Sequence, residues 1–491
     1  MTSLPDSPET AELPRLDVYQ PSDDPDDALR WLFEPVEGQR MHRRQRHTRA
    51  GRPFRATIAL LALSPLLALL SLRLVRFIDN TVLTLYGAGV LTATVLVMYL
   101  SFGWYYDKSR DVVLDPENAP AVTCMLAVKD DIDVITRCVN SVLDSDYPSL
   151  ELIVVDDAST DGTTEALAEL AARRTFTLVR LEKNVGKKRA LVEAATRARG
   201  DIFVFTDSDC IVSPYAISQC IKALLADPRI GAVSGHARAL NGTRTLLTRI
   251  QDTWYDGQFA VAKAAESVFG AVTCVSGPMA AFRREAVYNY LPAWAEDRFL
   301  GREFKFATDR QMTAYVLGQD RIGSKLKDRF RDSPFVSAVD YPERRWRVEY
   351  VSSARVLTNV PEKPSKLLKQ QARWKKSFIR NLFFTGGFLW RRGPLPAFLF
   401  YGHVLWVCAA PVLAFRHLIW FPLHGGLFLT GVYLAGVALK GSVWALAYKV
   451  QNPRSTKWVY RPLMSLMSST CLSWILPYSA LTLRKSVWSR G

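Results

Sequence analysis

The stretch DIFVFTDSD, residues 201–209, decides the fold. Its first six residues have the continuous apolar character of a strand buried on both faces, and acidic residues follow where a loop would begin. The carboxylates of Asp207 and Asp209 offer the hard oxygen ligands that Mg²⁺ or Mn²⁺ prefers. The stretch therefore predicts a metal site at the end of a buried strand, with an acidic loop that binds no metal as the alternative.

Three similar strands precede this stretch and alternate with helices. The strands are expected at 121–128, 150–155 and 176–181, and the helices at 135–143, 164–174 and 187–199, the last closed by Gly200 as its C-cap. This alternation predicts an α/β fold with a mostly parallel sheet and helices on both faces. Ligands of such sheets bind beyond the carboxyl ends of the strands.

Two further polar groups are expected at those strand ends. Asp156 and Asp157 follow the second strand, and they can accept hydrogen bonds from a base or a ribose, or else cap a turn in DDASTDGT. Lys187 follows Gly186 at a helix N-terminus, which is a natural phosphate site or a solvated basic helix start.

Long apolar runs flank the α/β domain. Runs near 56–75 and 81–103 each reach the ~20 residues that a membrane helix needs, and an arginine-rich block precedes them. The predicted units are a disordered cytosolic N-terminus at 1–55, two transmembrane helices at 56–103, the domain at 107–364, interfacial helices at 365–392, three or four transmembrane or interfacial helices at 394–483, and a tail at 484–491. The domain is thus inserted between transmembrane helices of a multi-pass cell-membrane protein, on the cytosolic side.

The formal net charge of +16 is attributed to the positive-inside loops and to anionic lipid, with an anionic substrate or product as the alternative. No nucleic-acid motif accompanies the charge, so nucleic acid is not an expected partner. The seven cysteines form no C-x-x-C pair and predict neither a zinc site nor a disulfide framework.

Five ordered motifs carry a resemblance to a known family. They are VVDD (154–157), GKKRA (186–190), TDSD (206–209), VSGPMAAFR (275–283) and QQARWKKS (370–377), with FLGREFKFATDRQMT (299–313) before the last. The chain resembles processive membrane family 2 glycosyltransferases, such as hyaluronan synthases and rhizobial chitin-oligosaccharide synthases. The resemblance covers residues 110–390 and implies a GT-A-like domain.

The resemblance implies a role for each candidate residue. Asp309 is the expected general base with Arg310 beside it, and Asp209 and Asp207 are the expected metal ligands. Asp156 or Asp157 is expected to bind the uridine, and Lys187 and Asp207 to contact the diphosphate, with Gln370 completing the QQARW pattern. Gly277 and Pro278 are expected to shape the acceptor end of the site. Arg373 is expected to neutralise phosphate charge and Trp374 to stack on the acceptor sugar. A surface ion pair is the alternative for Asp309 and Arg310, and membrane-interface anchoring for Arg373 and Trp374.

Some positions depart from the family pattern. Thr308 stands where hyaluronan synthases show a second acid, Phe304 stands where a cysteine is often found, and residues 319–346 look like a basic insertion. These departures leave the identity of the product open.

The expected function is processive inverting polymerisation of UDP-sugars and export of the polysaccharide. A hyaluronan-like product from UDP-GlcNAc and UDP-GlcA is favoured, and a chitin-like N-acetylglucosamine oligomer or another β-glycan is the alternative. A non-catalytic membrane sensor that binds a nucleotide-sugar is the alternative of another class. The expected partners are the UDP-sugar donor, the growing polysaccharide and the bilayer.

Overall fold

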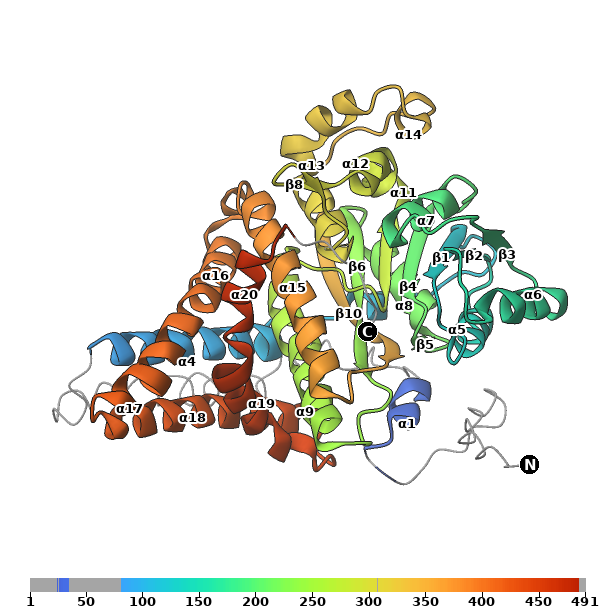
Figure 1. Ribbon diagram of the computed structural model, residues 1–491. Helices are drawn as coiled ribbons and strands as arrows, with labels where there is room; N and C mark the ends of the chain where they lie inside the picture. Colours follow the sequence, from blue (N-terminus) through green and yellow to red (C-terminus); the bar gives the residue numbers. More distant parts are fainter. Residues whose placement is uncertain (1–23, 25, 35–80, 307, 485–491) are drawn as a thin grey trace, which may run out of the picture.

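The computed structural model describes residues 24, 26–34, 81–306 and 308–484 (Figure 1). One eight-stranded sheet forms its centre, with the strand order β3-β2-β1-β4-β7-β6-β10-β5. The strands are β1 Val122–Val128, β2 Leu150–Asp156, β3 Thr177–Arg180, β4 Ile202–Asp207, β5 Cys210–Val212, β6 Ile230–Ala239, β7 Ala280–Arg283 and β10 Arg347–Thr358. Two short strands, β8 Arg298–Phe299 and β9 Arg302–Glu303, form a separate hairpin.

The first four strands along the chain form a parallel block. β1 lies between β2 and β4, and β3 pairs with the outer side of β2. Every residue of β1 is buried, as expected of a strand whose two faces are both covered. In this register Val128 pairs with Asp156 and Ala127 pairs with Asp207, so both acids lie at the same edge of the sheet.

The second half of the sheet is mixed. β7 runs antiparallel between β4 and β6, β10 runs parallel to β6, and β5 pairs antiparallel with β10. The predicted mostly parallel sheet is therefore confirmed, with β5 and β7 as its two antiparallel members.

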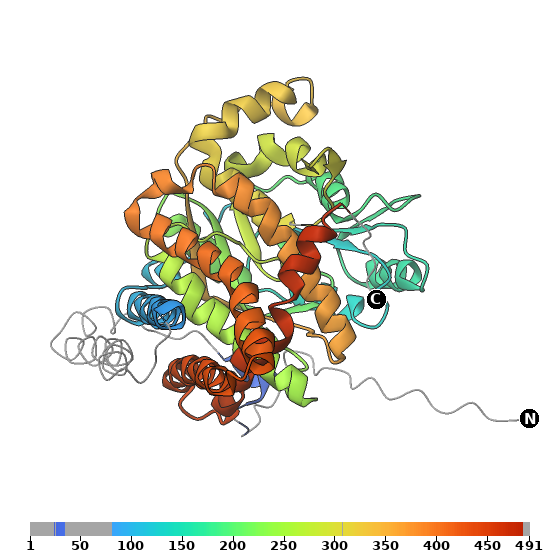
Figure 2. The ribbon, with the colours of Figure 1, turned by 60° about the vertical axis from the view of Figure 1, so that its left-hand side comes forward.

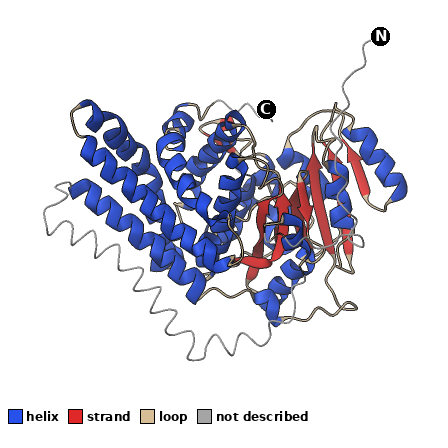
Figure 3. Cartoon of the chain, turned by 90° about the horizontal axis from the view of Figure 1, so that it is seen from below, coloured by secondary structure: helices blue, strands red, loops and turns tan. Residues whose placement is uncertain are grey.

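Helices cover both faces of the sheet (Figure 3). Those of the domain are α5 Ile135–Leu143, α6 Thr163–Arg173, α7 Lys187–Ala195, α8 Ala216–Ala226, α9 Leu246–Asp256, η3 Gly257–Lys263, α10 Ala264–Ser267, α11 Arg284–Val287, α12 Leu291–Ala295, α13 Thr308–Arg329 and α14 Pro334–Ser337, with short 3-10 turns η2 Lys108–Asp111 and η4 Tyr288–Tyr290. Residues 319–329, expected to belong to a basic insertion, continue α13.

The expected C-cap at Gly200 is wrong. α7 ends at Ala195 with Thr196 as its C-cap. Gly200 instead lies against β1, where a Cβ would come within 2.5 Å of the backbone nitrogen of Thr123. The glycine thus permits a close backbone approach, and the helix ends earlier than the sequence pattern indicated.

Helices from both ends of the chain gather beside the sheet (Figure 1). They are α4 Thr81–Gly103, α15 Pro364–Thr385, η5 Leu389–Arg392, α16 Pro394–Phe415, η6 Arg416–Trp420, α17 Phe421–Leu423, α18 Leu427–Gln451, η7 Lys457–Tyr460, α19 Arg461–Met467, η8 Ser468–Leu472 and α20 Ile475–Leu481. Three stretches in the described part of the chain are long and apolar enough to cross a membrane: Leu83–Asp111, Pro394–Leu423 and Leu427–Gln451. The span expected at 56–75 lies outside the described residues, and the number of spans stays a prediction.

Part of the N-terminal segment that was expected to be disordered forms a helix, α1 Ala28–Phe33. Leu32 is fully buried with Ile211 and Leu357, and the Arg355 guanidinium donates to the Trp31 carbonyl over 2.6 Å. The acidic composition of the segment gave no sign of this apolar contact. The helix packs against Ile211 of β5 and Leu357 of β10. Residues 1–23, 25 and 35–55 of this segment lie outside the described part of the chain.

A buried ionic group joins α15 to the α/β domain. Asp297 accepts hydrogen bonds from Lys188 of α7 at 3.1 Å and from Arg380 of α15 at 2.7 Å, and all three side chains are buried. Lys188 also donates to the Phe304 carbonyl at 3.1 Å. Burial lowers the pKa of Lys188, whereas the charge of Asp297 opposes that shift.

We expect the substitution Asp297→Ala to destabilise the protein by about 3–5 kcal/mol, because it leaves two buried cations without their shared counter-ion. The measurement is denaturant unfolding of purified protein in detergent. Asp328→Ala is the matched control: its ion pair with Arg331 is exposed on α13, so the expected loss is at most ~1 kcal/mol. Equal losses in the two variants would contradict the structural role of Asp297.

Candidate active site

Asp156 closes the turn that follows β2. Its carboxylate accepts from the backbone N–H of Ser159 at 3.0 Å and from the hydroxyl of Thr164 in the first turn of α6. The turn-capping alternative therefore describes what Asp156 does within the protein, and a ligand contact by Asp156 stays a prediction.

Asp157 holds the loop that leads into α7. Its two carboxylate oxygens accept from the backbone N–H groups of Val185 at 2.7 Å and of Gly186 at 2.9 Å. Burial raises the pKa of Asp157, and these two hydrogen bonds oppose that shift. Because Gly186 is the N-cap of α7, Asp157 fixes the position of the next residue, Lys187.

Lys187, the first residue of α7, reaches the acidic triplet. Its ammonium contacts the carboxylate of Asp207. The structure thus brings together two predicted site residues that lie at the ends of different elements. A helix N-terminus and an ammonium group together favour a bound anion at this position.

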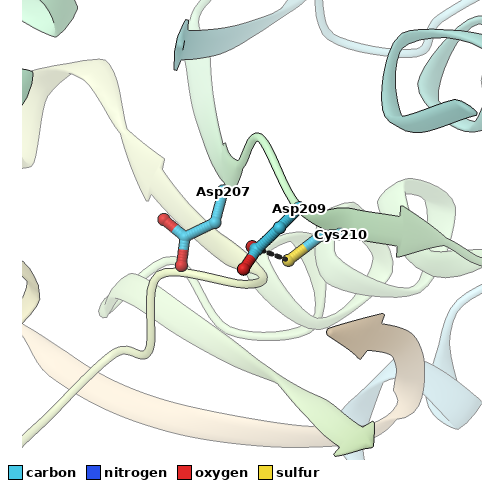
Figure 4. A group of neighbouring side chains, drawn as sticks. All are labelled: Asp207, Asp209 and Cys210. Atoms are coloured by element: carbon cyan, nitrogen blue, oxygen red, sulfur yellow. Dashed lines mark hydrogen bonds between the residues drawn. The ribbon is translucent and has the colours of Figure 1, made fainter. Parts of the chain in front are cut away.

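Asp207 and Asp209 flank the turn between β4 and β5. Their carboxylates and the Cys210 thiol offer ligand atoms that all lie within 4.8 Å of one another, and Figure 4 shows both carboxylates on the same side of the loop. Ser208 is directed elsewhere, with its hydroxyl bonded to Asp131.

The donor set fits a hard divalent cation. Burial and the charges of both aspartates raise the pKa of Cys210 well above its ordinary value, and a sulfur is a softer ligand than the oxygens that a hard cation prefers. The thiol lies 3.7 Å from Asp209 and can donate to it. Two carboxylates remain as ligands, which suits Mg²⁺ or Mn²⁺ completed by water or ligand oxygens.

Gly277 joins this site to the predicted base. Its backbone N–H donates to Asp309 over 2.9 Å. A Cβ on Gly277 would lie 2.9 Å from one carboxylate oxygen of Asp207 and 3.0 Å from the other. Only glycine therefore allows this close approach. The next residue, Pro278, accepts a hydrogen bond from Thr206 at 2.9 Å, which ties the loop to the end of β4.

Asp309 occupies the first turn of α13, where the helix dipole favours a negative charge. Besides Gly277, the hydroxyl of Thr308 donates to its carboxylate at 2.7 Å. Thr308 stands at the position where the family pattern has an acid, so a hydroxyl donor replaces a second carboxylate there. These contacts fix the carboxylate from the protein interior, unlike a surface ion pair with Arg310.

A small cavity unites three of these residues. Lys187, Gly277 and Asp309 are among its lining residues. The other lining residues are mainly apolar and comprise Leu191, Phe205, Val275, Ala280, Phe282, Trp294, Thr308 and Met312. The cavity therefore adjoins both the ammonium of Lys187 and the carboxylate of Asp309.

Lys263 supports the glycine loop and was missed in the sequence. It is buried at the end of η3, and its ammonium donates to the Cys274 carbonyl at 2.5 Å and to the Ser276 hydroxyl at 2.6 Å. Burial lowers the pKa of Lys263. A single lysine within a helical pattern gave no signal of this role, because its partners lie on a loop more than ten residues away.

The QQARW segment lies on α15 beside an aromatic cluster of α9. The ring of Trp374 lies 5.6 Å from that of Trp254 and 6.2 Å from that of Tyr255. Arg373 precedes Trp374 on the same helix and is half-buried. Figure 2 shows α15 running beside α20, and Ser479 of α20 donates to the Ala372 carbonyl at 3.3 Å.

Tyr255 connects QQARW to the acidic triplet. Burial raises its pKa, the charges of Asp209 and Asp207 raise it further, and a hydrogen bond with Gln370 opposes the shift. The ring of Tyr255, 6.2 Å from that of Trp374, lies beside QQARW. The sequence did not single it out, because an aromatic residue in a helix most often belongs to a core.

Comparisons with known proteins agree with this arrangement. Residues 123–291 match the family described as glycosyl transferase family 2. An N-acetylglucosaminyltransferase of Rhizobium meliloti (strain 1021) is 30% identical over 318 residues, which cover 62% of this chain and 68% of that protein. The chain belongs to glycosyl transferase family 2.

Two further proteins are similar to this chain. A hyaluronan synthase of Streptococcus pyogenes serotype M3 is 30% identical over 299 residues, 60% of this chain and 64% of that synthase, so the chain spans a little less than two thirds of it. The solved mannosyltransferase of Pyrobaculum calidifontis, in complex with GDP-Man and Mn²⁺, aligns with a TM-score of 0.46 and 23% identity over 83% of this chain and 100% of that chain. The predicted family resemblance is confirmed, whereas the predicted residue roles stay proposals.

We expect Gly277→Ala to weaken Mn²⁺-dependent UDP binding about tenfold, since an overpacked contact costs roughly 1–3 kcal/mol. The added methyl group would displace the carboxylate of Asp207. Calorimetry with and without Mn²⁺ measures the effect. Gly402→Ala is the control, because a Cβ there has nothing within 4 Å. Unchanged metal-dependent binding in Gly277→Ala would show that Asp207 does not hold the cation.

Proposed function

We propose that this chain is a processive inverting glycosyltransferase that polymerises UDP-activated sugars and exports the polysaccharide across the membrane. The observation that carries the proposal is the position of Gly277, whose backbone N–H donates to Asp309 over 2.9 Å and which lies so close to Asp207 that a Cβ would come within 3.0 Å of both carboxylate oxygens. It supports a site in which a leaving diphosphate near Asp207 and an acceptor hydroxyl near Asp309 lie side by side.

An inverting transfer needs one base and several cationic groups. Asp309 takes the proton from the acceptor hydroxyl as the hydroxyl attacks the anomeric carbon. A divalent cation on Asp207 and Asp209 supplies positive charge to the departing diphosphate when it is bound. Lys187 and Arg373 add positive charge, which stabilises the same developing negative charge. Arg310 adjoins the base on α13.

Residues are assigned to the donor end and the acceptor end of the proposed site from their positions in the fold. Asp157 fixes the loop on which Lys187 lies, and Asp156 or Asp157 contacts the uridine. Gln370 is assigned to binding of the nucleotide-sugar. Gly277 and Pro278 shape the acceptor end, where Trp374 offers a flat aromatic platform for the sugar.

A hyaluronan-like product from UDP-GlcNAc and UDP-GlcA is favoured, because hyaluronan synthases are among the relatives. A chitin-like oligomer is the second candidate, because an N-acetylglucosaminyltransferase matches over a larger share of its length. A sensor without catalysis is less favoured, since a sensor has no need for both a metal pair and a base. The catalytic domain is proposed to be cytosolic in a multi-pass membrane protein.

We expect Asp309→Asn to abolish sugar transfer while Mn²⁺-dependent UDP binding persists. The amide keeps the shape of the carboxylate but cannot accept the proton. UDP release and polymer formation are measured with purified protein, and calorimetry measures binding. Asp328→Asn on the same helix is exposed and serves as control. If Asp309→Asn retained transfer, or lost UDP affinity as much as turnover, the base would have to be another group.

We expect Trp374→Ala to lower elongation about tenfold more than it lowers hydrolysis of the UDP-sugar, since loss of a specific ring contact costs ~1–1.5 kcal/mol. Hydrolysis to water needs no acceptor platform. Both rates are normalised to folded protein. Trp390→Ala, which removes a ring that is 55% exposed on η5, is the control for interface anchoring. If elongation and hydrolysis fell by the same factor, Trp374 would be assigned to anchoring at the membrane interface and not to the acceptor site.

A further inference from the structure

A loop of residues 273–277 ends beside the proposed base. Its last residue, Gly277, donates its backbone N–H to the carboxylate of Asp309 over 2.9 Å. Loops are usually more mobile than the elements that they connect, so the geometry of this contact depends on what holds the loop. Each residue of the loop is bonded to a side chain, and these side chains lie on β6, η3, α10 and α13.

The helix α13 holds the loop at two points. The backbone N–H of Val275 donates to the hydroxyl of Thr313 at 2.8 Å, and that hydroxyl donates to the carbonyl of Asp309 at 2.7 Å. The contact of Gly277 with the carboxylate is the second point. Val275 and Thr313 are fully buried. A displacement of the loop would therefore displace the base as well.

Lys263, the last residue of η3, holds the same loop. An ammonium group has three N–H donors, and three oxygens accept from this one. They are the Cys274 carbonyl at 2.5 Å, the Ser276 hydroxyl at 2.6 Å and the hydroxyl of Ser234 on β6 at 3.1 Å. Ser234 also accepts from the backbone N–H of Ser276 at 3.2 Å. One buried lysine thus fixes the residue that precedes Gly277.

The burial of Lys263 is costly, and packing alone does not account for it. Its three acceptors are neutral oxygens, which replace the lost hydration of the ammonium only in part. The ammonium also lies 4.7 Å from the ring centroid of Phe259, one turn earlier in the chain. An apolar side chain of similar length would fill this space without the cost of a buried charge. The hydrogen bonds to the loop are therefore the distinctive contribution of the lysine.

The helix α10 continues η3 and holds the first residue of the loop. Glu266 accepts from the backbone N–H and from the hydroxyl of Thr273, both at 3.0 Å. Lys263 and Glu266 are three residues apart, a spacing that places two side chains on one face of a helix. Together they hold three of the five loop residues.

Two membrane-length helices in turn hold η3, a π-helix of the kind often found at functional sites. Val261 of η3 packs with Met98 of α4 and Ala447 of α18, and all three are buried. The side-chain amide of Gln451 on α18 donates to the Ala260 carbonyl at 3.1 Å. Both α4 and α18 belong to stretches long enough to cross a membrane. The loop is thus held by an element that is itself packed against these helices.

We propose that Lys263 is a positioning residue for sugar transfer, which holds loop 273–277 so that Gly277 keeps the carboxylate of Asp309 directed at the acceptor hydroxyl. The inference rests on the proposed function and adds a residue to its machinery. Lys263 acts through the loop and not on the sugar itself. Because η3 packs against α4 and α18, the same contacts fix the base relative to the membrane helices.

The test uses Lys263→Met in the full-length protein, since methionine has a similar length but none of the three donors. UDP release is measured with UDP-GlcNAc, alone and together with UDP-GlcA, and is normalised to folded protein. We expect kcat to fall about a hundredfold, the effect of a ~1 Å misplacement of a reacting group. The donor KM and the Mn²⁺-dependent affinity for UDP should change less than about twofold, because the base and not the donor is displaced.

Lys327→Met is the matched control. Lys327 is also buried and also holds a loop, since it donates to the Tyr341 carbonyl at 2.9 Å and pairs with Glu343 at 2.9 Å. It lies near the other end of α13 from Asp309. Its loss should lower the stability of the protein but leave kcat per folded molecule at the wild-type value.

Ser276→Ala supplies a milder variant that removes one acceptor of Lys263. We expect kcat to fall about tenfold, which corresponds to ~1.4 kcal/mol. The double variant Lys263→Met with Ser276→Ala should be no slower than Lys263→Met alone, because both changes remove the same contact.

Four results would overturn the inference. They are a wild-type kcat in Lys263→Met, a loss confined to KM, losses that multiply in the double variant, and an equal loss of kcat in Lys327→Met. If Lys263→Met does not fold, Ser276→Ala decides, and a wild-type kcat there overturns the inference. A wild type that transfers no sugar from either donor refutes the proposed function, and the positioning role falls with it.

Discussion

The backbone N–H of Gly277 donates a hydrogen bond to Asp309, and the same residue lies so close to Asp207 that an added methyl group would meet both carboxylate oxygens. Two negative charges are thereby held next to each other, which requires compensation. Lys187 contributes one positive charge and the N-terminus of α13 contributes part of another. The remaining negative charge favours a divalent cation at Asp207 and Asp209, whose carboxylates can hold one.

Much of this arrangement could be predicted from the sequence, because its parts are local. Buried strands that end in Asp156 and Asp207 show as apolar runs followed by acids, and parallel pairing brings both ends to one edge of the sheet. The order of the motifs supplied the family. The positions of the two antiparallel strands are not encoded in such runs, since β5 has only three residues and β7 only four.

The contacts that hold the site together could not be predicted from the sequence, because each joins segments far apart in the chain through a residue that belongs to no motif. Lys263 looks like a solvated lysine, yet it holds the loop before Gly277. Tyr255 looks like a core aromatic, yet it lies between the acidic triplet and α15. The N-terminal helix α1 was masked by its acidic surroundings, although Leu32 packs against Ile211, two residues after Asp209.

The same charges connect the site to the helices beside it. Arg380 of α15 shares Asp297 with Lys188, the neighbour of Lys187, so the helix that carries Trp374 is bound to the helix that carries the proposed diphosphate contact. Asp297 of the α/β domain thus neutralises both Lys188 and Arg380. Residues 363–491, to which Arg380 and the cations of α15, α16 and α18 belong, contain no acid of their own. The positive charge of this part of the chain is therefore compensated by aspartates of the α/β domain where the two parts are joined, as it is also at Lys457, which pairs with Asp252 over 2.9 Å.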